Sequence, residues 1–166
     1  MSIISKTDVV NIVRLGDINV LDEYFNYIST GIKCTYLTYM VEIGNKKTYF
    51  SSNDGWQNVF IKDGLINYCP IYKNAFIAVE NKRYVFTAWD NVLHKKGDEQ
   101  DVMDLRMSLG IAHGLGLAIK RDGIRESLVF AGHVNDSLFH EKIAKDSVLI
   151  CNAIKMFRSV FKVENS

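Results

Sequence analysis

Cysteine is scarce in this sequence, and its three copies are not arranged in pairs. Cys34, Cys69 and Cys151 lie far apart among 166 residues, and no two of them have the C-x-x-C spacing of a zinc site. An odd number of distant cysteines argues against a disulfide framework and suits a reducing compartment. We therefore expect a cytoplasmic protein without structural disulfides.

A surplus of one charge is also missing. Lysine and arginine together number 20, aspartate and glutamate 19, and the formal net charge is +1 without a long run of either sign. A surface that neutralises many phosphates carries a basic excess. We therefore expect no direct binding of nucleic acid and no attraction to an anionic membrane.

Long apolar runs, linkers, repeats and low-complexity tracts are absent too. No stretch approaches the roughly 20 apolar residues that cross a bilayer. The N-terminal MSIISKTDVVNIVR has neither the apolar core nor the cleavage site of a signal peptide. With 48% hydrophobic and 23% charged residues, the composition is that of one globular domain, which we expect to cover residues 1–166.

Apolar residues recur at helical spacing in several segments, and capping residues mark where some of them begin. Asn53 or Asp54 is suited to cap one helix, Pro70 to open the next, and Asn135 with Asp136 to cap a long amphipathic helix near the end. The predicted helices cover residues 7–14, 19–29, 54–64, 70–79, 98–111 and 136–162.

Five segments rich in β-branched and aromatic residues predict strands. Gly44 with Asn45 and Asp122 with Gly123 are turn pairs, so antiparallel hairpins are expected around them. The predicted strands cover residues 34–43, 47–51, 83–87, 115–120 and 127–133. Helices on both sides of such strands predict an α+β fold, in which helices sandwich a five-stranded antiparallel sheet.

One predicted strand has a bulky face and a nearly bare face. In GLGLAI, residues 114–119, the leucines and the isoleucine point one way, whereas Gly114, Gly116 and Ala118 point the other. Protein interiors are close-packed, so the bare side must be filled. Either a closely packed helix or a bound ligand would fill it.

The candidate catalytic groups do not form a recognisable set. Cys69 has no histidine near it in the sequence and no nucleophile signature around it, so a small buried residue is the better interpretation. His113, His133 and His140 lack a recognised metal-ligand spacing. We therefore predict that the protein is not an enzyme and holds no metal or cofactor.

An apolar cavity with aromatic walls is better supported. Trp56, Phe60 and Trp89 offer broad, stiff surfaces, and Tyr39 and Ser127 offer a few polar contacts. Cavities of this kind bind small apolar ligands. We therefore expect a binding site for a small molecule.

Three stretches also carry a resemblance to a known family: GWQNVFIKDGLINYCPIYKNAF, YVFTAWDN and DLRMSLGIAHGLGLAIKRDGIRESLVFAG. Together they resemble the autoinducer-binding domain of LuxR-type quorum-sensing transcription regulators, over residues 7–162. The resemblance implies a PAS/GAF-like α-β-α sandwich around a five-stranded antiparallel sheet. It also implies that an N-acyl homoserine lactone binds between the sheet and one helical layer.

The same resemblance implies roles for individual residues. Trp56 matches the tryptophan whose indole N–H donates to the lactone carbonyl. Trp89 matches, with a one-residue shift, the tryptophan that packs on the lactone ring, and Gly114 matches a structural glycine. The further positions that match pocket residues are Leu37, Tyr39, Ile71, Tyr72, Gly116 and Val129.

Three polar anchors of the family are replaced by less polar side chains. Cys69 stands where the family has an aspartate that accepts the ligand's amide N–H, and Phe60 where it has a tyrosine that donates to the acyl carbonyl. Val129 stands where a serine or threonine is common. Each buried polar group left without a partner costs about 1–3 kcal/mol. An ordinary acyl homoserine lactone is therefore expected to fit poorly.

The chain ends at Ser166, whereas the family continues into a helix-turn-helix domain. We therefore expect a single ligand-binding domain, either cut from a longer regulator or naturally without the DNA-binding half. The main hypothesis is a sensor of a small apolar signal molecule. The alternative is a stand-alone interaction protein that pairs with, or inhibits, a full-length regulator. We expect a homodimer, or a heterodimer with such a regulator. For the interaction protein, analogy with the family makes the predicted helix over residues 136–162 the dimer surface.

Overall fold

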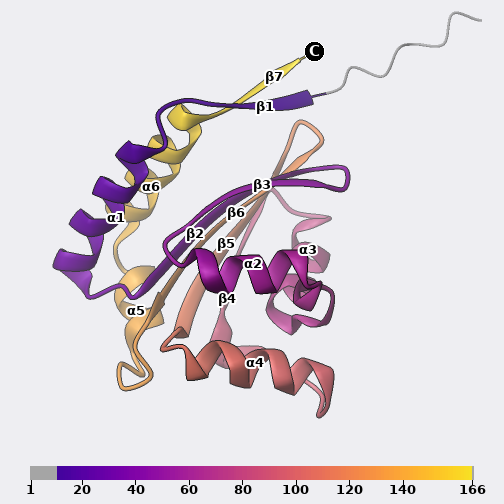
Figure 1. The fold of residues 1–166 in the computed structure, drawn as a ribbon, viewed down its shortest axis with the longest axis vertical. Coiled ribbons are helices and arrows are strands. Elements are labelled where there is room, and N and C mark those ends of the chain that lie inside the picture. Colours follow the sequence, from indigo (N-terminus) through magenta and orange to yellow (C-terminus); the bar gives the residue numbers. More distant parts are fainter. Residues whose placement is uncertain (1–10, 166) are drawn as a thin grey trace, which may run out of the picture.

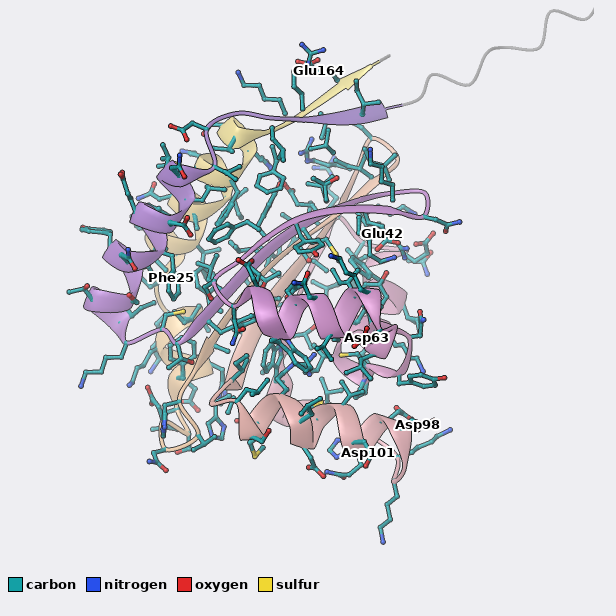
Figure 2. The ribbon with its side chains drawn as sticks, in the orientation of Figure 1. Phe25, Glu42, Asp63, Asp98, Asp101 and Glu164 are labelled. Atoms are coloured by element: carbon teal, nitrogen blue, oxygen red, sulfur yellow. The ribbon has the colours of Figure 1, made fainter. Side chains whose placement is uncertain are left out.

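The structure is a computed structural model and describes residues 11–165. Its elements form three layers, with one sheet between two groups of helices (Figure 1). Side chains fill the space between the layers (Figure 2). Among the described residues, no helix is both long enough and apolar enough to cross a membrane.

The central sheet has five antiparallel strands in the order β3-β2-β6-β5-β4. These are β2 (Tyr36–Ile43), β3 (Lys46–Ser51), β4 (Tyr84–Ala88), β5 (Ala112–Arg121) and β6 (Ile124–Gly132). The two predicted hairpins are present, and Gly44 and Gly123 adopt positive φ in their turns, as such tight turns require. The predicted α+β class and five-stranded antiparallel sheet are confirmed.

Helices cover both faces of this sheet (Figure 1). On one face lie α1 (Asn19–Ile32), α5 (Phe139–Ala144) and α6 (Ser147–Val160). On the other lie α2 (Asp54–Lys62), α3 (Pro70–Val79) and α4 (Asp98–Ser108), with the short 3-10 helices η1 (Leu65–Tyr68) and η2 (Trp89–Asn91). Asp98 and Asp101 lie in the first turn of α4, where the helix dipole favours acidic side chains (Figure 2).

The pleat of β2 divides its side chains between these two faces. Leu37, Tyr39 and Val41 pack with α1 and α6, whereas Tyr36 and Met40 pack with the helices of the opposite layer. All but the last residue of the strand are buried. Covering both faces is what a strand apolar on both sides requires.

The predicted single helix over residues 136–162 is wrong, because two helices occupy this segment. Asp146 interrupts it: its carboxylate accepts a hydrogen bond from the backbone N–H of Leu149 at 3.0 Å and so caps α6. Asn135 and Asp136 cap no helix, since α5 begins after Leu138 without a side-chain cap. The break lets α5 and α6 pack on different parts of the sheet.

The predicted helix over residues 7–14 differs as well. Residues 7–10 lie outside the described part, and the remainder belongs to β1 (Asn11–Leu15), which pairs antiparallel with β7 (Phe161–Asn165). The β-branched Ile12 and Val13 favour a strand over a helix. Their partner strand lies at the other end of the chain, so no local sequence pattern predicts this pairing.

A buried carboxylate ties α6 to the centre of the sheet. Glu126 of β6 is 1% exposed and accepts hydrogen bonds from Arg158 of α6 at 2.6 and 3.0 Å, from Arg121 at 3.4 Å and from the Tyr39 hydroxyl. Burial alone would raise the pKa of Glu126, but these donors outweigh it and the pKa is lowered. Burial and the neighbouring carboxylate both raise the pKa of Tyr39.

We predict that Glu126→Gln lowers the free energy of unfolding by about 2–3 kcal/mol at neutral pH. This is less than the 3–5 kcal/mol of a fully buried pair, because Arg158 and Arg121 are 39% and 31% exposed and therefore partly screened by water. The native pKa of Glu126 is lowered, so its contribution is present above the unfolded pKa, about 4.3, and is lost as the pH falls through the native pKa.

Urea unfolding of wild type and variant at neutral and acid pH measures this difference. Glu23→Gln, at an exposed position of α1, is the matched control and should leave stability nearly unchanged. A difference between wild type and Glu126→Gln that stayed constant into acid would contradict the prediction.

Candidate functional site

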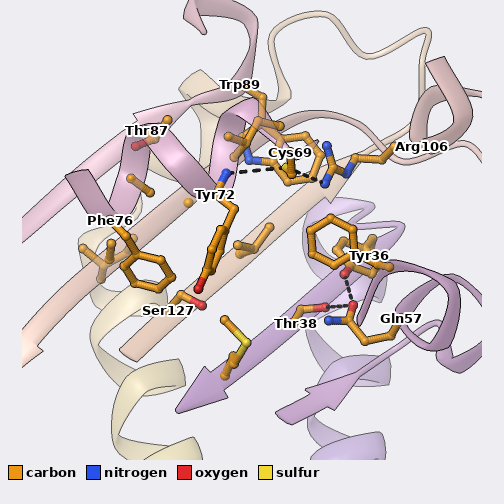
Figure 3. Close-up of a pocket in the computed structure, with 18 residues that line it drawn as sticks. Tyr36, Thr38, Gln57, Cys69, Tyr72, Phe76, Thr87, Trp89, Arg106 and Ser127 are labelled. Atoms are coloured by element: carbon orange, nitrogen blue, oxygen red, sulfur yellow. Dashed lines mark hydrogen bonds between the residues drawn. The ribbon is translucent and has the colours of Figure 1, made fainter. Parts of the chain in front are cut away.

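A cavity of about 80 Å³ lies between the sheet and the layer of α2, α3 and α4 (Figure 3). It is roughly half the ~150 Å³ that accommodates benzene in an engineered apolar cavity. Its wall is mostly aromatic and aliphatic. The lining residues are Tyr36, Thr38, Met40, Gln57, Phe60, Cys69, Ile71, Tyr72, Ala75, Phe76, Thr87, Trp89, Arg106, Gly116, Leu117, Ala118, Ser127 and Val129.

Helix α2 supplies one aromatic wall. Asn53 caps this helix by accepting a hydrogen bond from the Trp56 backbone N–H at 3.0 Å, which confirms the predicted capping position. Trp56 and Phe60 are one helical turn apart, and their rings stack at 5.3 Å between centroids. Phe60 borders the cavity, whereas Trp56 is buried behind it.

Helix α3 supplies the second wall, and its first residues set the position of the helix. Pro70 opens the helix as predicted, since its missing N–H is not needed there. The Cys69 sulfur accepts a long hydrogen bond from the backbone N–H of Tyr72, at 3.5 Å, in the place of an N-cap oxygen. A sulfur is a weak acceptor, so this helix has a poor cap next to the cavity.

The bare face of β5 accommodates an indole ring and the cavity. A Cβ on Gly114 would lie 2.5 Å from the Trp89 ring, so only glycine fits under that side chain. Gly116 and Ala118 border the empty space itself. Of the two expected fillers, a closely packed helix does not fill all of this face, and the space beside Gly116 and Ala118 is where the second, a bound ligand, would lie.

Arg106 of α4 is the only charged side chain among the described residues that line the cavity. It is 4% exposed, and its guanidinium carbon lies 5.2, 5.3 and 4.9 Å from the ring centroids of Trp56, Phe60 and Trp89. These distances are those of cation–π contacts. Three aromatic rings from two different segments therefore surround one buried cation.

A hydrogen-bonded group lies at the β2 wall of the cavity (Figure 3). The Oε1 atom of Gln57 accepts from the Tyr36 hydroxyl at 2.6 Å and from the Thr38 hydroxyl at 3.4 Å. Burial raises the pKa of Tyr36, so its hydroxyl remains a donor. Near the other end, the Tyr72 hydroxyl donates a hydrogen bond to the Glu42 carboxylate at 2.5 Å. Burial, together with this carboxylate, raises the pKa of Tyr72.

Eight of the eleven predicted ligand-binding residues line this one cavity: Phe60, Cys69, Ile71, Tyr72, Trp89, Gly116, Ser127 and Val129. Trp56 lies in the second row, behind Phe60 and against Arg106. The prediction that Leu37 and Tyr39 line the site must be corrected, because their side chains point to the α6 face of the sheet. Their neighbours on β2 line the cavity instead, since adjacent strand residues point to opposite faces.

Sequence reasoning missed Arg106, and the signal that marks it is a weak one. Val102 and Arg106 are the buried residues of α4, four positions apart and therefore on the same side of the helix. That spacing places an arginine on the inward face of an otherwise polar helix. Gln57 and Thr38 were missed for a similar reason, because polar residues next to a core are ordinarily exposed.

The histidines considered as metal ligands do not gather into a site. His113 and His140 both approach Asp90, with Nδ1 to Oδ2 distances of 2.8 and 3.6 Å, whereas His133 accepts a hydrogen bond from the Asn135 backbone N–H. No group of three or more His, Cys, Asp or Glu residues within positions 11–165 is arranged to hold a metal ion.

Comparison with known proteins yields a fold but no close relative. No protein-family model matches the chain, and no curated protein matches it by sequence. A crystal structure of the N-acylhomoserine lactone dependent LuxR family transcription factor CepR2 from Burkholderia cenocepacia aligns over 88% of this chain and 85% of its own, with 14% identity and a TM-score of 0.61.

Two structures of the protein SdiA align as well. The first, from Escherichia coli, covers 86% of this chain at 11% identity and a TM-score of 0.56. The second, in complex with octanoyl-rac-glycerol, covers 79% at 11% identity and a TM-score of 0.52. The chain spans 61% and 56% of those two chains. The chain therefore has the fold of the LuxR-family autoinducer-binding domains, which confirms the resemblance at the level of the fold.

We predict that Cys69→Asp stabilises the protein by about 1–3 kcal/mol relative to Cys69→Asn. The Cys69 sulfur lies 3.2 Å from Nη2 of Arg106, so a carboxylate at this position would give the buried guanidinium a counter-ion. Asparagine caps a helix as well as aspartate does, so the pair of variants isolates the charge. Urea unfolding measures it, and an aspartate variant no more stable than the asparagine variant would show that Arg106 does not need an anion there.

Proposed function

We propose that the chain is the small-molecule sensing domain of a LuxR-type transcription regulator. The observation that carries this proposal is the cavity between the sheet and α2–α4, which is lined by aromatic side chains and a few polar groups. Concave, mostly apolar pockets with a few polar groups are typical of small-molecule sites, and this one, at about 80 Å³, must widen to admit a whole ligand. The fold supports the proposal, because its structural neighbours include a regulator described as N-acylhomoserine lactone dependent.

The expected ligand is apolar over most of its length and differs from an ordinary acyl homoserine lactone. Cys69 and Phe60 both line the cavity and offer neither the strong acceptor nor the hydroxyl donor that the family resemblance implies at these positions. Ser127 and Thr87 supply hydroxyl groups elsewhere in the wall. SdiA, which has the same fold, has been crystallised with octanoyl-rac-glycerol, so this fold accepts head groups other than a lactone.

We predict that an acyl compound raises the thermal unfolding temperature of the protein and that Ala118→Leu abolishes the rise. Ala118 lines the cavity and is 1% exposed, so a larger side chain at this position fills space that a ligand needs. At a ligand concentration of about 100 times Kd, binding stabilises the native state by about 2.7 kcal/mol. Differential scanning fluorimetry with acyl homoserine lactones of several lengths and with octanoylglycerol measures the effect.

Ala144→Leu, at an exposed position of α5 on the opposite face of the sheet, is the matched control and should respond as wild type does. Native mass spectrometry of the purified protein detects any molecule that copurifies. A protein that neither responds to these compounds nor carries a copurified molecule would contradict a sensing role.

A second function, that of an interaction protein, is favoured by an exposed apolar surface. Tyr84 and Phe86 of the edge strand β4 are 60% and 48% exposed, and they border a groove whose other wall includes Ile150 and Ile154 of α6. Exposed apolar patches mark interaction surfaces. In this alternative the chain pairs with a second copy or with a full-length regulator.

We predict that Phe86→Asp weakens this association by at least about tenfold, since it replaces an exposed apolar side chain of the groove with a charged one. Light scattering coupled to size exclusion measures the mass over a range of concentrations. Tyr27→Asp, on the exposed side of α1, is the control, because Tyr27 is 76% exposed and does not line the groove. A wild-type protein that remains monomeric at high concentration would count against a homodimer through this surface.

A further inference from the structure

Arg106 is a buried cation without a buried anion. It takes part in none of the ion pairs of the described chain. Its hydrogen bonds within residues 11–165 go only to sulfur atoms, from Nη2 to Cys69 at 3.2 Å and from Nη1 to Met103 at 3.5 Å. A guanidinium has five N–H donors and sulfur is a weak acceptor, so most of its hydrogen-bonding capacity is unused.

The surrounding rings compensate this charge only in part. Trp56, Phe60 and Trp89 all lie within 5.3 Å of the guanidinium carbon, and their electron-rich faces attract a cation. Aromatic rings do not replace the acceptors that the N–H groups lose on leaving water. Buried charges in proteins are ordinarily paired with an opposite charge.

A second donor at the same end of the cavity also lacks an acceptor. The Trp89 indole nitrogen is buried and makes no hydrogen bond within the described residues. It lies 3.9 Å from the position that a Cβ on Gly116 would occupy, so it is close to the cavity wall. Both side chains line the cavity, and Arg106 stacks on the Trp89 ring (Figure 3).

The two donors border the same cavity, and the rest of the wall limits the charge of an acceptor bound beside them. Arg106 is the only cation among the described lining residues, so the site balances one negative charge and not two. Away from this end, Met40, Phe76 and Ala118 form an apolar cluster. A ligand that suits both ends has one anionic group and an apolar body.

We propose that the signal molecule is a carboxylate, whose carboxyl group is bound by the Arg106 guanidinium and the Trp89 indole N–H while its apolar body lies against Met40, Phe76 and Ala118. This inference rests on the proposed sensing function and names the class of ligand. Arginine is suited to the role because its planar donors match the two oxygens of a carboxylate. The Cys69 thiol then contacts the guanidinium from the side that the ligand leaves free.

The decisive comparison is between ligands that share an alkyl chain and differ in charge. Octanoate, methyl octanoate and N-octanoyl homoserine lactone are titrated into the full chain by calorimetry at neutral pH, where a carboxylate is ionised. Octanoate should bind about 10 to 100 times more tightly than the methyl ester. Equal affinity of octanoate and the ester would overturn the carboxylate proposal while leaving a sensing role intact, and no binding by any of the three would contradict both.

Variants of Arg106 locate the source of the preference. Arg106→Met should bind octanoate and its methyl ester equally, because it keeps the apolar stem and removes the charge. Arg106→Lys keeps the charge without the planar fork and should retain part of the preference. Arg83→Met, at an exposed position that borders the groove with α6 and does not line the cavity, is the matched control and should bind as wild type does. A full preference for octanoate in folded Arg106→Met would overturn the assignment of Arg106.

Circular dichroism establishes that each variant is folded. Should Arg106→Met not fold, the wild-type ratio of octanoate to ester affinities still decides the question.

Discussion

The alternation of side chains across the central sheet is the constraint on which the rest of this structure depends. Strands β2, β5 and β6 are largely buried on both faces, so each residue belongs either to the core under α1 and α6 or to the layer under α2, α3 and α4. The first face is closed by large side chains, among them Tyr39, whose ring stacks on Phe157 at 4.7 Å. On the second face, Gly116 and Ala118 leave room for a cavity.

The two faces of the sheet also differ in whether their buried charges have a counter-ion. Under α6, the carboxylate of Glu126 is matched by Arg158 and Arg121, and the group is complete within the protein. Under α4, Arg106 has only rings and sulfur atoms around it. Buried polar networks that are fully satisfied stabilise a single arrangement, whereas an unsatisfied buried group is costly and calls for a functional or structural explanation. This contrast is the physical basis for treating the second face as the site.

The cavity combines features that the family resemblance implies with side chains that depart from it. Gly114 fits under Trp89 because no Cβ is tolerated there, and Pro70 begins the helix that closes the cavity. Cys69 and Phe60 make the wall less polar, and Arg106 adds a charge at the same end. The absence of the acceptor and donor that the family resemblance implies at Cys69 and Phe60, together with the buried cation of Arg106, favours a ligand whose binding depends on charge rather than on an amide or a lactone carbonyl.

Local interactions determined most of the secondary structure from the sequence alone. The cap at Asn53, the proline at position 70 and the glycine turns at positions 44 and 123 act within a few residues, so their elements were predicted and are present. Eight cavity residues were also identified in advance. What tertiary structure alone decided involves distant partners or the register of a strand: the pairing of β1 with β7, the face on which Leu37 and Tyr39 lie, and the meeting of Arg106 with Cys69, which are 37 positions apart. A strand shifted by one residue exchanges its two faces, and the environment of a buried charge exists only once the segments around it have come together.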